Sequence, residues 1–132
     1  MLDMTEIDAK LVKLQELTDK LDTVAFEVLR QKTSRALSGL LTYSVNPVVI
    51  ISPLCRILDI NNLAKKKFGY PENDHLIKFN ISKLLPGYND DDHSVGILSA
   101  DGITSAHDIL QVQFVRIPLV FEAEWIKCLI FV

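Results

Sequence analysis

The side chains that could do covalent or metal chemistry are scattered along this sequence. Cys55 and Cys128 are isolated thiols, and no Cys/His cluster has the spacing of a zinc site. No serine or cysteine stands in a nucleophile elbow, and no glycine-rich loop is placed to cradle phosphates. We therefore expect no catalytic residue, no metal and no enzymatic activity. Two cysteines are too few for a disulfide scaffold, which favours a reducing, cytoplasmic location.

Two charged runs are best explained as solvated surface. The run NDDDHSVG (residues 89–96) resembles a calcium loop, but it lacks the alternating acidic spacing and the terminal glutamate. Lys65, Lys66 and Lys67 form the exposed face of a short helix. The chain carries 14 basic and 17 acidic residues, a net charge of -3, so we expect no nucleic-acid partner. No apolar run approaches membrane-spanning length, and no membrane association is expected.

The elements that must position any site begin with an amphipathic helix. Asp3 and Glu6 have capping-box spacing, with Thr5 as a competing cap. A seven-residue repeat then follows, and all of its positions but Thr18 are apolar. This repeat predicts a coiled-coil seam that pairs two chains, although a helix lying on its own domain would show a similar stripe. The dimer interface predicted from it consists of Met4, Ile7, Leu11, Leu14, Leu21 and Val28.

The composition changes after the first third of the chain. All five prolines lie beyond residue 44, and Pro47 ends the helical region. Residues 34–42 read as a second helical stretch or a continuation of the first. We therefore divide the chain into an amphipathic helix at residues 1–36 and a domain at residues 37–132. The chain stops inside an expected last strand, which suggests a fragment of a longer protein.

The remainder predicts a mostly antiparallel sheet with short helices. Residues 48–52 and 56–60 form a hairpin. Asn61 caps a short helix at residues 63–68, and Gly69 closes it. Further strands are expected at residues 95–98, 108–117 and 121–132, with turns at Asp101-Gly102 and around Pro118.

The last strands are apolar on both faces, so both faces of the sheet need cover. The short helices can cover one face. The N-terminal helix or a second subunit must cover the other, which is the main physical argument for association.

The segment at residues 46–70, NPVVIISPLCRILDINNLAKKKFGY, resembles the opening of a PAS domain. The matching residues are Arg56, Ile57, Leu58, Ile60, Asn61, Ala64, Phe68, Gly69 and Tyr70. A second piece, HLIKFNISKLLPGY (residues 75–88), is similar to the PAS pattern at Leu76, Ile77, Asn80, Ile81, Leu84, Leu85 and Pro86. The resemblance implies an α+β fold: a five-stranded antiparallel sheet with short helices on one face and a long N-terminal helix.

The resemblance also bears on cofactors. The flavin-binding branch of the family needs a cysteine after the Asn80 position, where this chain has Ile81. The haem branch uses a histidine on the connecting helix, and His93 lies in an acidic loop instead. The connecting helix itself is shortened or missing here. We therefore expect no cofactor.

By resemblance, the chain is a regulatory module that dimerises and signals to an attached effector, such as a kinase, cyclase, phosphodiesterase or transcription factor. A small apolar ligand would sit in a pocket between the sheet and the short helices. The alternative is a ligand-free dimerisation or docking domain whose pocket is packed shut. The residues expected near the pocket are Ile50, Ile60, Leu63, Phe68, Ile77, Ile81, Leu84 and Phe114.

Overall fold

Five antiparallel strands form one sheet in the order β2-β1-β5-β4-β3. The computed structural model describes residues 4–91, 96–121 and 123–132. The first and last strands in the sequence, β1 and β5, pair with each other at the centre of the sheet. The α+β class and the antiparallel sheet predicted from the sequence are confirmed. The strands are β1 (Val48–Ile51), β2 (Ile57–Ile60), β3 (Ile97–Ile103), β4 (Ile109–Phe121) and β5 (Glu124–Phe131).

Two short helices follow the first hairpin, α2 (Asn62–Lys67) and the 3-10 helix η1 (Ile81–Lys83). The side chain of Asn61 caps α2 by accepting a hydrogen bond from the Ala64 amide at 3.0 Å. Gly69, at φ 78°, ends it, and the Tyr70 amide donates back to the Lys65 carbonyl at 2.8 Å. Only a residue without a Cβ adopts this left-handed conformation readily. Both capping predictions are confirmed.

One face of the sheet, here called the front, packs against α2, η1 and the loops around them. The front cluster is built from branched aliphatic residues and three phenylalanines. The rings of Phe68 and Phe131 lie 5.5 Å apart edge to face, and those of Phe114 and Phe131 lie 5.7 Å apart. The buried members are Val49, Ile51, Ile57, Ile60, Ala64, Phe68, Leu76, Ile81, Leu84, Leu85, Val112, Phe114, Leu129 and Phe131.

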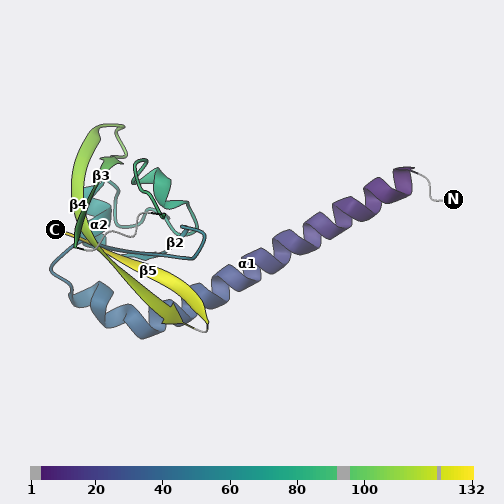
Figure 1. Cartoon of the computed structure of the whole chain (residues 1–132), viewed down its shortest axis with the longest axis horizontal. Helices are drawn as coiled ribbons and strands as arrows, with labels where there is room; N and C mark the ends of the chain where they lie inside the picture. Colours follow the sequence, from purple (N-terminus) through teal and green to yellow (C-terminus); the bar gives the residue numbers. More distant parts are fainter. Residues whose placement is uncertain (1–3, 92–95, 122) are drawn as a thin grey trace.

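The opposite, rear face packs against the long helix α1 (Met4–Tyr43). Only the second half of α1 lies on the sheet, while its first half extends away from it (Figure 1). The helix runs unbroken through residue 36, so no structural break marks the division expected there. The rear cluster consists of buried Phe26, Val48, Ile50, Leu58, Ile126 and Cys128, with Leu29, Leu37, Leu41, Ile77, Leu119, Phe121 and Ile130 packed against it.

Two turns expected from the sequence lie inside strands instead. Asp101 and Gly102 belong to β3, and the chain reverses at residues 104–108, where the Thr104 amide donates to the Asp108 carbonyl at 3.0 Å. Pro118 lies within β4. Among the described residues, the pairing of β3 ends where Ile97 meets Val115. Beyond that pair, the side of β4 away from β5 has no described partner strand, and a proline without an N–H is tolerated there.

Cover on the rear face is incomplete. Ile117 pairs with Cys128 across the strands and therefore shares its face, yet Ile117 is 39% exposed. Ile97 and Ile109, on the same face near the β3 edge, are also exposed. The second half of α1 thus covers β1, β2 and β5 on the rear face. The sequence predicted either this helix or a second subunit as the cover. The helix leaves the β3–β4 side of the rear face open.

Candidate functional site

The most prominent surface feature is the free segment of α1, residues 4–21. Every side chain in it is exposed except that of Ile7, which is half-buried. The segment nevertheless carries large apolar side chains at seven-residue spacing. Leu14 is 60% exposed and Leu21 is 69% exposed. We call the seven-residue stripe the seam: Met4, Ile7, Leu11, Leu14, Thr18, Leu21, Ala25 and Val28.

The seam and the sheet-facing stripe of α1 lie on different sides of the helix. Phe26 and Thr33 are the buried residues of α1 and face the sheet. At 3.6 residues per turn, Ala25 and Val28 lie about 100° and about 160° round the helix from Phe26. Val28 is accordingly 46% exposed. The sheet of the same chain therefore leaves the seam uncovered, including where the helix rests on the sheet.

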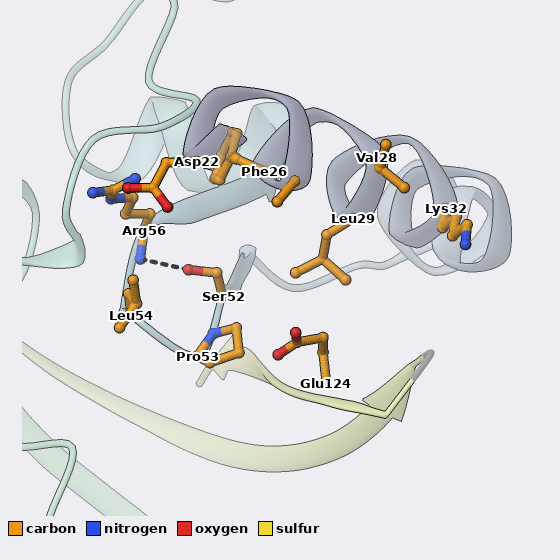
Figure 2. Close-up of a pocket in the computed structure, with 11 residues that line it drawn as sticks. Asp22, Phe26, Val28, Leu29, Lys32, Ser52, Pro53, Leu54, Arg56 and Glu124 are labelled. Carbon is orange, nitrogen blue, oxygen red and sulfur yellow. Dashed lines mark hydrogen bonds between the residues drawn. The ribbon is translucent and has the colours of Figure 1, made fainter. Parts of the chain in front are cut away.

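A groove of about 390 Å³ lies where α1 leaves the sheet. Figure 2 shows α1 forming one wall, with Phe26, Val28 and Leu29, and the β1–β2 turn with Pro53 and Leu54 lying opposite. The centre of the groove is apolar. Its full lining is Asp22, Ala25, Phe26, Val28, Leu29, Lys32, Ser52, Pro53, Leu54, Arg56 and Glu124.

The β1–β2 turn that forms the far wall is held by its own hydrogen bonds. The Arg56 amide donates to the Ser52 hydroxyl at 3.1 Å (Figure 2), and the Ser52 amide donates to the Arg56 carbonyl at 2.8 Å. Cys55 takes a left-handed conformation, with φ 62°. These bonds turn Leu54 outward, where it is 71% exposed.

Most residues expected to line a ligand pocket are brought together in the front cluster. Ile60, Phe68, Ile81, Leu84 and Phe114 are all buried there. Their side chains meet each other and the ring of Phe131, and Gly102 lies so close that an added Cβ would stand 3.0 Å from the Phe68 ring. The front cluster is therefore filled by its own side chains.

The other three expected pocket residues lie elsewhere. Ile50 belongs to the rear cluster, because alternate residues of β1 point to opposite faces of the sheet. Leu63 is 41% exposed and lines a shallow hollow with Leu41 and Thr42 at the end of α1. Ile77 is half-buried and contacts both clusters. Strand alternation would have separated Ile50 from the rest, had the front-facing positions been known.

A polar cluster closes the front core near the loop that follows η1. Asp90 accepts hydrogen bonds from Lys127 and from the Tyr88 hydroxyl, the latter at 2.9 Å. Arg116 donates to the Tyr88 hydroxyl at 3.3 Å and to the Asn89 carbonyl at 3.1 Å. Burial by itself raises the pKa of Asp90, but the hydrogen bonds from Lys127 and Tyr88 outweigh it and lower that pKa overall.

Neither thiol is activated. Burial raises the pKa of Cys55 to about 11, and neighbouring Asp90 adds to the rise. Burial alone raises the pKa of Cys128 to about 11. Both groups are therefore protonated near neutral pH, which makes them poor nucleophiles.

Some expectations concern metals, membranes and the acidic loop. Within residues 4–91, 96–121 and 123–132, no group of three or more His, Cys, Asp or Glu side chains could hold a metal ion. In the same part of the chain, no helix is both long enough and apolar enough to cross a membrane. His93 and its neighbours at residues 92, 94 and 95 lie outside the described residues.

Sequence reasoning missed the groove. Its far wall comes from Leu54, in a turn, and from Glu124, at the start of β5. No local signal marked it, because a single leucine next to Pro53 in a turn is ordinary on a protein surface.

The fold is that of several solved PAS domains. The PAS domain of an HTR-like protein from Haloarcula marismortui aligns with a TM-score of 0.59 at 16% identity, covering 77% of this chain and 97% of that one. A PAS domain from a two-component sensor histidine kinase aligns with a TM-score of 0.61 at 11% identity, covering 84% and 97%. No family model and no curated protein matches the sequence.

A third structure covers almost all of this chain, α1 included. It is the Escherichia coli DhaR(N)-DhaL complex, with a TM-score of 0.59, 14% identity and coverage of 98% of this chain and 46% of that one. The chain therefore has a PAS fold, as the two sequence motifs predicted. At these identities the likeness establishes the fold alone.

Proposed function

We propose that this chain is a regulatory PAS module that forms a homodimer through the seam of α1 and transmits a signal to an attached effector domain. The observation that carries the proposal is the exposure of the seam. Leu14, Leu21 and Val28 stay exposed, although the same helix buries another stripe on its own sheet. Apolar side chains at coiled-coil spacing are stabilised when a second helix covers them.

Of the two versions considered from the sequence, the packed front cluster supports the ligand-free one. A ligand at Phe68, Phe114 and Leu84 would have to displace side chains that are at most 2% exposed and in mutual contact. Opening such a core costs several kcal/mol, which a small apolar ligand would have to offset. The structural likeness to a sensor-kinase PAS domain supports a signalling role for this chain.

The mechanism proposed is a bias between two helix arrangements. The second half of α1 rests on the rear face of the sheet, and the first half carries most of the seam. A shift in packing at the sheet would change how two seams meet and so how two effectors are positioned. A partner can move this equilibrium only through its different affinity for the two arrangements.

Sedimentation equilibrium of the whole chain at about 100 µM tests the proposal. We expect a species of twice the chain mass of 14.9 kDa. Leu14→Glu and Leu21→Glu should shift it to the monomer, while thermal unfolding compared at a concentration where all the proteins are monomeric is unchanged. Val12→Glu is the matched control, since Val12 is 58% exposed but lies off the seam. A wild-type monomer at this concentration would refute the proposal.

A further inference from the structure

The seam has two flanks, which differ in what they carry. On a heptad count that places Ala25 and Val28 in the seam, Leu17 and Val24 fall on one flank and Asp22 and Leu29 on the other. In most coiled coils both flanks are charged. Here Leu17 is 56% exposed and Val24 is 59% exposed. The seam alone does not explain these two apolar residues.

The second flank leads directly into the groove. Asp22 and Leu29 both line it, as do the seam residues Ala25 and Val28. The groove continues outward from this flank to Pro53 and Leu54 on the β1–β2 turn (Figure 2). Any helix seated on the seam therefore also lies beside the groove.

The geometry of a parallel, in-register helix pair fixes what would lie there. In such a pair, each residue of the first flank meets the residue of the second flank five positions later on the other chain. Val24 of one copy then meets Leu29 of the other. Resting on the dimer proposed above, we propose that Val24 of a second copy of this chain fills the groove, between Leu29 and the turn residues Pro53 and Leu54.

The charges around the groove favour an apolar occupant. Its lining carries two acidic residues, Asp22 and Glu124, and two basic ones, Lys32 and Arg56. These formal charges cancel, so the groove offers no net attraction to an anionic or cationic partner. A valine from a two-fold related helix matches the apolar centre, and the symmetry repeats the contact in the other half of the dimer.

This arrangement makes the β1–β2 turn part of the dimer interface. The turn is continuous with β1 and β2, which contribute to both the front and rear clusters. A change of packing within the sheet would thus reach the helix pair through Leu54 as well as through the rear face.

A charge-rescue experiment on the whole chain tests the contact. We expect Val24→Asp and Leu54→Lys each to raise the dimer dissociation constant about tenfold or more, because each places a charge at the apolar centre of both grooves of the dimer. The double variant Val24→Asp/Leu54→Lys should recover most of the lost affinity, since the two charges then pair. Val24 and Leu54 are both more than half exposed in the single chain, so thermal unfolding of the monomers, measured at a concentration below the dissociation constant, should be unchanged.

The matched control replaces Leu54→Lys with Val45→Lys. Val45 is 91% exposed and lies between α1 and β1, away from the groove. Val45→Lys alone should leave the dissociation constant unchanged, and Val24→Asp/Val45→Lys should show no rescue. Rescue by both lysines would overturn the proposed contact, because it would reduce the effect to net charge.

The helix orientation is checked by Ala25→Cys, which should form a disulfide across a parallel, in-register seam under mild oxidation. The wild-type thiols are buried or half-buried, so the wild-type chain should stay uncrosslinked. A dimer that dissociates with Leu14→Glu but is unaffected by Leu54→Lys would overturn the groove contact and leave the dimer intact. The dye anilinonaphthalene sulfonate, which binds apolar surface, gives a further check. If the wild-type chain binds the dye and Leu54→Lys abolishes dye binding without changing dimerisation, the groove would instead be assigned to a small molecule.

Discussion

Asn61 and Val48 are joined by two hydrogen bonds across the first hairpin. The Val48 amide donates to the Asn61 side-chain oxygen at 2.9 Å, and the Asn61 amide donates to the Val48 carbonyl at 3.1 Å. The same side-chain oxygen caps α2. The side-chain NH2 group of Asn61 donates to the Asn46 carbonyl at 3.0 Å. One buried side chain thus fixes the entry to β1 and the start of α2 together.

We expect Asn61→Ala to lower the free energy of unfolding by about 2–4 kcal/mol, more than the loss of a helix cap alone, because it leaves buried backbone groups without partners. Urea denaturation measures this. Asn62→Ala, at the exposed next position, should change it by less than about 0.5 kcal/mol. A loss of no more than about 1 kcal/mol for Asn61→Ala would reduce Asn61 to an ordinary cap.

Gly102 is constrained by close contacts with the front layer. A Cβ there would stand 3.0 Å from the Phe68 ring and 3.2 Å from the Leu84 and Leu110 carbonyl oxygens. Since backbone carbonyls cannot move aside cheaply, Gly102→Ala should destabilise the protein by about 1–3 kcal/mol. Thermal unfolding followed by circular dichroism measures the effect.

Gly39 is the matched control for this substitution. It lies in α1 with nothing within 4 Å of an added Cβ. Gly39→Ala should stabilise the protein by up to about 1 kcal/mol, because alanine favours the helix. If both alanines shift the melting temperature in the same direction, steric crowding is not the reason at Gly102.

The Asp90 cluster predicts a dependence of stability on acid pH. The lowered pKa of Asp90 means that the fold favours its ionised form, so this contribution is present above the ordinary aspartate pKa of 3.8 and is lost as the pH falls through the lowered pKa of the folded state. Asp90→Asn should therefore be less stable than wild type at neutral pH, and the two melting temperatures should converge as the pH falls through the lowered pKa of Asp90. Asp91 is an exposed neighbour, and the melting temperature of Asp91→Asn should follow that of wild type at every pH. If the difference in melting temperature between Asp90→Asn and wild type persists in acid, the ion pair is not its cause.

Removal of residues 1–21 tests whether the domain depends on the free segment. The lost side chains that the structure describes, those of residues 4–21, are exposed apart from half-buried Ile7, so the remaining chain should unfold with nearly the same urea midpoint when both proteins are monomeric. The truncated chain should also no longer dimerise. A collapse of the urea transition would instead show that the segment packs on the chain's own domain.

Thr33 lies on the sheet-facing side of α1 and is fully buried. Among the described side chains, its hydroxyl has no hydrogen-bond partner in the structure. Burial of an unpaired hydroxyl costs about 1–3 kcal/mol. Thr33→Val keeps the shape of the side chain, so we expect it to stabilise the protein, whereas Thr33→Ser should not. Differential scanning calorimetry distinguishes the two, and a destabilised Thr33→Val would point to a bond that the hydroxyl makes in solution.

Local signals in the sequence predicted much of the fold. Asn61 and Gly69 mark the ends of α2 because capping depends on residues a few positions apart. The same locality explains two errors. The local pattern predicts turns at Gly102 and Pro118, yet Gly102 is needed where Phe68 approaches β3, and Pro118 is tolerated where β4 extends beyond its pairing with β3. Both reasons involve partners distant in sequence.

The seam of α1 is a property of the sequence alone, since its seven-residue spacing follows from helix geometry whatever the helix touches. The tertiary structure decided which stripe of α1 the sheet covers, because that depends on where Phe26 and Thr33 meet β1, β2 and β5. It also decided that Ile50 faces away from Phe68, and that Leu54 stands across a groove from Leu29. Such contacts between distant segments arise only when the sheet register brings them together, which no local pattern specifies.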